Sequence, residues 1–153
     1  MAVTIREMKR RFIRAEQNLD SDIEVIVKIL EHQIIDLNRE DQLFEKSINI
    51  YNKSIGLYAH TYEPEIGQSL AGYPKIKDHP YNLHDYGDFS KSFRLEKGNG
   101  KLKIFNDDPK LSLIEQNTGK GLIGLTIDNT EKLNFKMIRP MLVDFVRRHI
   151  KGN

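Results

Sequence analysis

Apolar residues recur every three or four positions from residue 23 onward, which is the spacing of one face of an α-helix. The row consists of Ile23, Ile26, Val27, Leu30, Ile34 and Leu37. The same spacing continues through Leu43 and Phe44 toward Ile48. The pattern predicts one long helix in the first third of the chain.

The start of this helix is predicted at Ser21. Ser21 and Glu24 stand in the order of a capping box, in which each side chain bonds the backbone N–H of the other residue. Asp22 and Glu24 would also place negative charge at the positive end of the helix dipole. A main domain of residues 20–153 is therefore expected to begin here.

A shorter amphipathic segment precedes it. Ile5, Met8 and Phe12 fall at helical spacing with basic residues around them, so residues 1–19 are expected to form a basic N-terminal arm or helix. Docking on a protein partner is the leading interpretation of this arm, followed by a solvated helix. Contact with nucleic acid ranks third, because the arm lacks the interleaved aromatic residues of a single-strand binder.

The middle of the chain changes character. Residues 50–62 combine tyrosines and apolar residues with Gly56, which predicts a turn followed by a short strand. Residues 63–82 are rich in proline and glycine, which predicts a long extended loop. Long loops in small domains are often functional, and a contact surface is the expected role.

Two alternating segments, 89–97 and 101–105, predict a β-hairpin. Gly98, Asn99 and Gly100 supply the positive φ angles that its turn needs. One face is expected to carry Phe93 and Leu95, and another Leu102 and Ile104.

The C-terminal third predicts two further helices. Residues 106–109 should end the second strand and cap a short helix that closes near Gly119. Residues 121–125 fit either a short strand or a tight packing turn. Residues 126–150 are again helical, and Pro140 must either kink this helix or begin a new one.

Together these elements predict an α+β fold. A long N-terminal helix would pack on a small antiparallel sheet with a hairpin and a C-terminal helix, and the basic arm would precede this single domain. A chain of 153 residues is long enough to bury a core without metals or disulfides. The chain has no cysteine, and no apolar run approaches the roughly 18 residues that would cross a membrane.

Charge is distributed unevenly, although the net charge is only +2. Residues 1–19 hold five Lys and Arg against two Glu, whereas residues 20–45 hold eight Asp and Glu against two Lys and Arg. This arrangement suggests complementary contacts between copies of the chain or with a neighbouring protein. Two solvated helix faces explain it equally well.

One string matches a cofactor motif. Residues 119–124 fit G-x-G-x-x-G, but the dinucleotide fingerprint requires a preceding strand and a helix that opens within the motif. Here the sequence predicts a helix before the string and the next helix only near Asp128. We therefore interpret the glycines as turn and close-packing positions, and expect no cofactor.

No other arrangement predicts catalysis or metal binding. His79, His84 and Asp85 lack the spacing of a zinc site. Ser90 and Ser92 lack the surroundings of a nucleophile elbow. The chain is expected not to be an enzyme, with no catalytic, cofactor or metal site.

Short motifs resemble those of structural proteins from tailed bacteriophages and prophages, especially of Bacteroidetes hosts. They are Asp41-Gln42-Leu43-Phe44-Glu45-Lys46, Ile55-Gly56-Leu57-Tyr58, Asn82-Leu83, Gly87-Asp88-Phe89, Ser92-Phe93 and Gly124-Leu125-Thr126. The resemblance covers roughly residues 20–150. The chain departs from the pattern at Ser47, where many relatives have glycine, and at the turn near Asn52, which lacks one.

The resemblance implies a non-enzymatic α+β domain that assembles into a ring in the head–tail connector (neck) or tail-completion assembly of a virion. Expected partners are further copies of the chain, other virion proteins such as portal, adaptor or tail proteins, and packaged DNA, but no membrane. The chain would be assembled into the virion in the host cytoplasm. The expected interface residues are Arg6, Lys9, Arg10, Phe12, Tyr62, Pro64, Tyr73, Pro74 and Tyr81.

The main alternative is a nucleic-acid-binding accessory protein. It would use the basic arm and the cationic C-terminal segment 147–151. The small net charge argues against this alternative.

Overall fold

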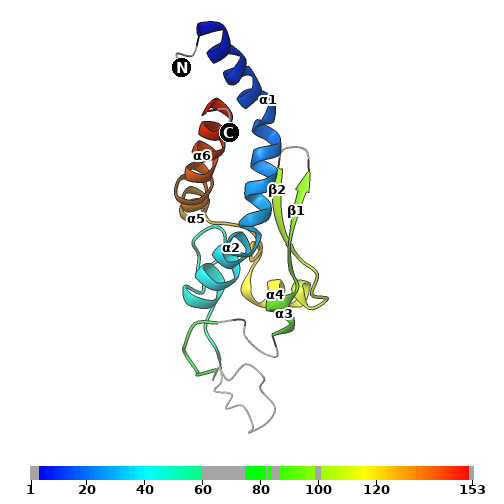
Figure 1. Cartoon of the computed structure of the whole chain (residues 1–153). Helices are drawn as coiled ribbons and strands as arrows, with labels where there is room; N and C mark the ends of the chain where they lie inside the picture. Colours follow the sequence, from blue (N-terminus) through cyan, green and yellow to red (C-terminus); the bar gives the residue numbers. More distant parts are fainter. Residues whose placement is uncertain (1–3, 60–74, 82, 84–86, 99–100, 152–153) are drawn as a thin grey trace. The chain divides into compact units, whose positions relative to one another are not determined.

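The computed structural model describes residues 4–59, 75–81, 83, 87–98 and 101–151 (Figure 1). It confirms an α+β fold with a long first helix, a two-stranded antiparallel sheet and a C-terminal helix. Its contacts divide the chain into two compact units. One comprises residues 1–32 with 130–153, and the other comprises residues 33–129.

The first unit is built on helix α1 (Ile5–Ile29). Thr4 caps it, because its Oγ1 accepts a hydrogen bond from the backbone N–H of Glu7. The predicted capping box at Ser21 is wrong: Ser21 lies inside α1, and its hydroxyl donates to the carbonyl oxygen of Asn18. The predicted boundary between residues 19 and 20 also falls within this continuous helix.

The physical reason is that the apolar row of the predicted arm and that of the long helix belong to one face. Residues 5, 8, 12, 15, 19, 22 and 26 follow one another in alternating steps of three and four, and all except Asp22 are apolar. A row with this spacing stays on one side of a helix only if the helix is unbroken. The packing of a continuous apolar face therefore keeps the helix unbroken through Ser21, although the residues there could cap a new helix.

The same unit contains the π-helix η2 (Lys132–Ile138) and helix α6 (Arg139–Lys151), and α6 lies beside α1 (Figure 1). Pro140 is the second residue of α6, so the change from π- to α-helix occurs beside it. The backbone stays helical on both sides, with φ −56° and ψ −46° at Arg139. Proline has no N–H to donate to the preceding turn, and the change of helix type lies where that bond is missing. The helical path therefore continues through Pro140, which does not begin a separate helix.

Helix α1 ends at Ile29, and the second unit begins a few residues later at Gln33. Helix α2 (Glu31–Asp36) and the π-helix η1 (Leu37–Glu45) continue the helical path as far as predicted. The strand predicted within residues 50–62 is absent from the described residues 50–59. Two isolated bridges stand in its place, Ile48 with Ser54 and Leu57 with Pro80.

The predicted hairpin is confirmed as β1 (Phe93–Gly98) and β2 (Lys101–Asn106). Residues directly opposite one another share a face, and Leu95 pairs with Ile104 and Lys97 with Leu102. The assignment of these apolar residues to two faces is therefore wrong. Residues 88–91, expected to be partly strand, form helix α3 (Asp88–Lys91). The turn residues 99–100 lie outside the described residues.

Helix α4 (Leu111–Thr118) follows the hairpin and ends at Gly119, as predicted. Before it, the Asp108 carboxylate accepts from the backbone N–H of Lys110, so an aspartate turn introduces the helix. Residues 121–125 form a packing turn, not a strand, and lead into helix α5 (Ile127–Glu131).

The core of the second unit is apolar and closely packed. Phe89 and Phe93 meet edge to face with ring centroids 5.4 Å apart. The buried cluster consists of Ile35, Leu43, Ile55, Phe89, Phe93 and Leu122. It brings together helices, loop and hairpin, and gives this unit a core of its own.

Candidate functional site

The expected interface residues fall into three groups. Arg6, Lys9, Arg10 and Phe12 lie on the first half of α1 and are all exposed. Tyr81 belongs to the second unit and is half-buried. The remaining four, Tyr62, Pro64, Tyr73 and Pro74, lie outside the described residues. The structure therefore assigns the described candidates to two separate units.

The inward row of α1 is covered along only part of its length. Ala15 and Ile26 are buried, whereas Ile5, Met8 and Phe12 are 89%, 48% and 54% exposed. The first turns of α1 extend past the last described turn of α6 (Figure 1). The apolar face thus continues beyond the helix that covers it within its own chain.

Helix α6 is also incompletely covered. It contains no fully buried residue. Its inward side chains stay half-buried, and they are Met141, Leu142, Phe145, Val146, His149 and Ile150. Two helices side by side bury one stripe each, whereas a four-helix bundle encloses a core. The α1–α6 pair is therefore open to further packing.

Two polar contacts hold this pair together. The guanidinium of Arg11 donates from Nη1 to the carbonyl oxygens of Ile150 and Lys151, at 3.0 and 3.2 Å. These carbonyls belong to the last turn of α6, where no intrahelical donor is available. Deeper in the pair, Nε2 of His149 lies 2.9 Å from a carboxylate oxygen of the buried Asp22. Both contacts fix the register of the two helices.

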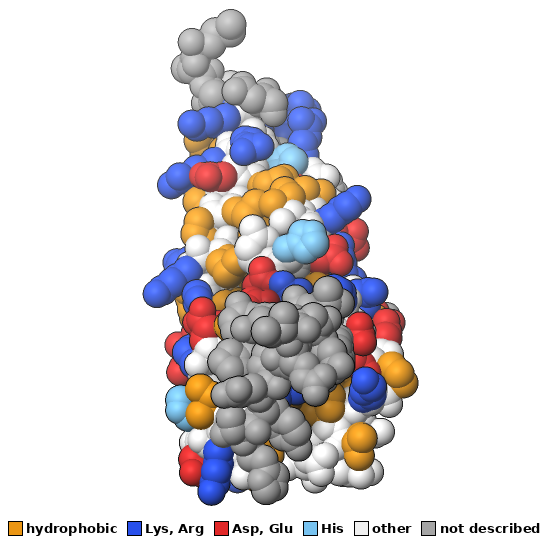
Figure 2. Space-filling model, turned by 90° about the horizontal axis from the view of Figure 1, so that it is seen from below, with side chains coloured by type: hydrophobic (Ala, Val, Ile, Leu, Met, Phe, Trp, Pro, Cys, Tyr) orange, Lys and Arg blue, Asp and Glu red, His pale blue; other side chains and the backbone are white. Residues whose placement is uncertain are grey.

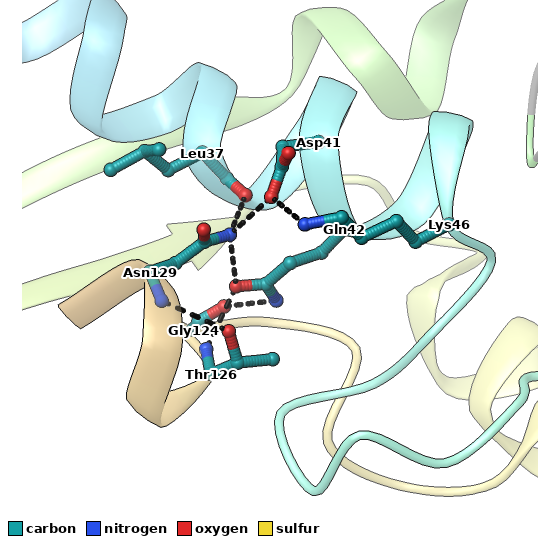
Figure 3. A network of polar contacts seen from close by, with 7 residues as sticks. All are labelled: Leu37, Asp41, Gln42, Lys46, Gly124, Thr126 and Asn129. Atoms are coloured by element: carbon teal, nitrogen blue, oxygen red, sulfur yellow. Dashed lines mark hydrogen bonds and ion pairs between the residues drawn. The ribbon is translucent and has the colours of Figure 1, made fainter. Parts of the chain in front are cut away.

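A network of buried amides lies in the second unit, between η1 and the segment that leads into α5 (Figure 3). Gln42 is fully buried. Its Nε2 donates to the carbonyl oxygen of Gly124 at 3.0 Å, and its Oε1 accepts from the backbone N–H of Thr126 at 2.8 Å. The Gln42 amide thus replaces the backbone partners that this non-helical turn lacks.

Asn129 extends the network from α5. Its Nδ2 lies within hydrogen-bond distance of the Leu37 carbonyl oxygen, a carboxylate oxygen of Asp41 and Oε1 of Gln42, at 2.8, 2.7 and 3.1 Å. The same carboxylate oxygen of Asp41 forms an ion pair with Lys46 at 2.8 Å (Figure 3). The network therefore runs from the interior to the surface.

Asn38, one turn before Gln42, makes the matching contacts. Its Nδ2 donates to the carbonyl oxygen of Leu122, and its Oδ1 accepts from the backbone N–H of Gly124. Asn38 and Gln42 are both fully buried and follow Ile34 at steps of four residues. Polar residues on an otherwise apolar row were the available sequence signal, and the sequence reasoning missed it.

The glycine string is part of this structural system. Gly121 and Gly124 have φ angles of 89° and 126°. A Cβ on Gly121 would lie 2.9 Å from Cε2 of Tyr51. The interpretation as turn and close-packing positions is confirmed.

The second unit also contains a cavity of about 470 Å³. Tyr58 and Tyr81, whose rings meet edge to face, form one part of its wall. Lys75 and Lys110 oppose Asp88 and Asp108 in charge, so the lining favours neither anions nor cations. The carboxylate of Asp108 is already engaged with the backbone of the aspartate turn.

The described residues contain no group of three or more His, Asp or Glu side chains placed to hold a metal ion. His84 and Asp85, considered above with His79, lie outside that part of the chain. Ser90 and Ser92 bond backbone carbonyls of the α3 turn, at Gly87 and Asp88. These hydroxyls thus serve the local backbone.

Charges of both signs are interspersed with hydrophobic side chains on the described part of the face that Figure 2 shows. A face of this kind produces no strong field of one sign. Within the described residues, no helix is both long enough and apolar enough to span a membrane.

Comparison of the chain with protein-family models, with curated proteins and with solved structures gives no match. Its function is therefore inferred from its own residues and geometry, together with the resemblance of its short motifs.

Proposed function

We propose that this chain is a non-enzymatic structural subunit of a virion, a ring-forming component of the head–tail connector (neck) or tail-completion assembly of a tailed bacteriophage. The specific assembly follows from the resemblance of the short motifs within residues 20–150. The general role, a chain that acts by docking on other proteins, follows from the open α1–α6 pair.

The observation that carries the proposal is the incomplete burial of this pair. Ile5, Met8 and Phe12 continue the inward row of α1 into solvent, and α6 has no fully buried residue. Exposed apolar rows of this kind are typical of surfaces that dock on another chain. Multivalent contact within a ring would make individually weak contacts jointly strong.

The test is to locate the chain in purified phage particles by electron microscopy. The Met8→Ser/Phe12→Ser double variant should be lost from the particles, because it makes the uncovered end of the row polar. The Val143→Ser variant is a suitable control, because Val143 is exposed on α6 outside this row. A chain that stays monomeric at high concentration and is missing from wild-type particles contradicts the proposal.

Nucleic-acid binding is the second candidate. Arg6, Lys9 and Arg10 are exposed, and none has an ion-pair partner among the described residues. Binding through these side chains would give retention on DNA that falls steeply as salt is raised. Retention that is unaffected by charge reversal at Arg6 and Arg10 would exclude them as the contact.

A further inference from the structure

A second row of residues runs along α1 on the side opposite to the inward row. Its members follow one another in alternating steps of four and three, and all are exposed: Arg6, Arg10, Ile13, Gln17, Asp20 and Glu24. At about 3.6 residues per turn these steps keep the row straight along the helix for about 27 Å. We call these six residues the outer stripe.

The outer stripe reverses sign at its centre. Its first two members are arginines and its last two are carboxylates, with Ile13 and Gln17 between them. Arg6, Arg10 and Asp20 have no ion-pair partner within the described part of the chain, whereas Glu24 also takes part in an interaction of its own chain. Such a stripe is complementary to its own reversed copy.

We infer that the outer stripe is a self-recognition surface, on which α1 of one copy binds α1 of a second copy in antiparallel orientation. A two-fold axis at the level of Ala15 places Arg6 opposite Glu24 of the second copy and Arg10 opposite its Asp20. The two-fold symmetry repeats both pairs, which gives four arginine–carboxylate pairs. Parallel pairing would instead place arginine against arginine.

At the centre of this contact, the same symmetry places Ile13 opposite Gln17 of the second copy. Ile13 is 43% exposed, so each Ile13 can pack against the aliphatic part of the facing Gln17 between the charged ends. A small uncharged centre with charged ends gives a specific orientation but a modest affinity. The resulting dimer is weak and sensitive to salt, because exposed ion pairs are screened.

This contact is isologous, so it closes on itself and joins two copies only. A ring needs a different, heterologous contact. The inference therefore does not depend on the proposed function. If the chain does not dimerise, the test of the proposed function in phage particles still stands. If the chain is missing from particles, the test of the dimer still stands.

The experiment uses two complementary charge variants of the full chain. Arg6→Glu/Arg10→Glu makes the outer stripe acidic, and Asp20→Lys/Glu24→Lys makes it basic. Each variant alone repels its own copy, so its association should weaken at least tenfold. An equimolar mixture restores all four opposite-charge pairs, so it should associate at least as well as wild type. Sedimentation equilibrium measures the association, and circular dichroism confirms that the variants remain folded.

The Lys101→Glu/Lys103→Glu variant is the matched control, because it makes the same charge change at exposed positions of β2. It should associate like wild type. Wild-type association should also weaken when salt is raised from about 50 mM to about 0.5 M.

Three results would overturn the inference. One is a wild-type chain that stays monomeric in low salt at about 1 mM, well above the dissociation constant of a weak specific dimer. The second is unchanged association of either charge variant, and the third is a mixture that does not recover. If the wild-type chain is monomeric and binds DNA, and Arg6→Glu/Arg10→Glu abolishes the DNA binding, Arg6 and Arg10 would be assigned to nucleic-acid contact instead.

Discussion

The two units of this chain differ in how completely they bury their apolar side chains. In the second unit, buried amides satisfy a non-helical turn, and an apolar cluster closes around Leu122. In the first unit, α1 and α6 are joined by a few polar contacts, and most of their apolar side chains remain half-buried or exposed. The second unit therefore closes its own core, whereas the first leaves apolar surface that the proposed docking would cover.

The largest expected effect is at the amide network. Gln42→Leu removes the side-chain amide that bonds two backbone groups, the half-buried carbonyl of Gly124 and the buried N–H of Thr126. Two such groups should lower the free energy of unfolding by about 4 kcal/mol. Urea denaturation followed by circular dichroism measures this loss. Gln33→Leu, an exposed position on α2, should change little; a similar loss in both variants would contradict the structural role of Gln42.

Matched leucine truncations compare the two units directly. Leu122 is fully buried in the second unit, so Leu122→Ala should cost about 3 kcal/mol in unfolding free energy. Leu142 is half-buried on α6, so Leu142→Ala should cost about 1 kcal/mol. Equal losses in denaturant titrations of the isolated chain would show that the first unit is packed as well as the second.

The Asp22–His149 contact allows the contribution of one polar interaction between α1 and α6 to the unfolding free energy to be measured. Asp22→Ala should lower the unfolding free energy by about 1 kcal/mol, since it removes a hydrogen-bonded, buried carboxylate while gaining helix propensity. Glu16→Ala, on the exposed side of the same helix and outside the outer stripe, serves as control. If thermal melts of the two variants coincide, the contact does not stabilise the pair.

The smallest expected effect concerns a turn in the second unit. Asn52 is exposed and has a φ angle of 57°, which costs a non-glycine residue strain. Asn52→Gly relieves that strain but adds unfolded-state entropy, so a net gain of about 0.5 kcal/mol in stability is expected. Asn52→Ala should be less stable than wild type. Calorimetry that ranks glycine below asparagine would refute this account.

The elements with strong local signals could be predicted from the sequence. Alternation and a glycine-rich turn predict the hairpin, and Gly119 predicts the end of α4. The helix start at Ser21 was wrong because a local capping pattern was weighed above a continuous apolar face. Ser47 and Asn52 have positive φ angles of 52° and 57°, a conformation that favours glycine, although neither residue is a glycine.

The network could not be predicted in the same way. Asn38 and Gln42 contact Leu122, Gly124 and Thr126, more than eighty residues later in the chain. Such contacts depend on the position of a turn that is distant in the sequence. A local sequence pattern does not determine that position. The interface residues outside the described ranges, such as Tyr62 and Tyr73, stay predictions.

The contact between Arg11 and the last turn of α6 has a consequence for synthesis. The second unit is inserted between the two halves of the first unit, so all its residues are synthesised before α6. It can fold while α1 still lacks a partner, since domains generally fold as units during synthesis. Until α6 packs on it, the inward row of α1 is exposed, so the growing chain is open to capture by chaperones or other chains during that interval.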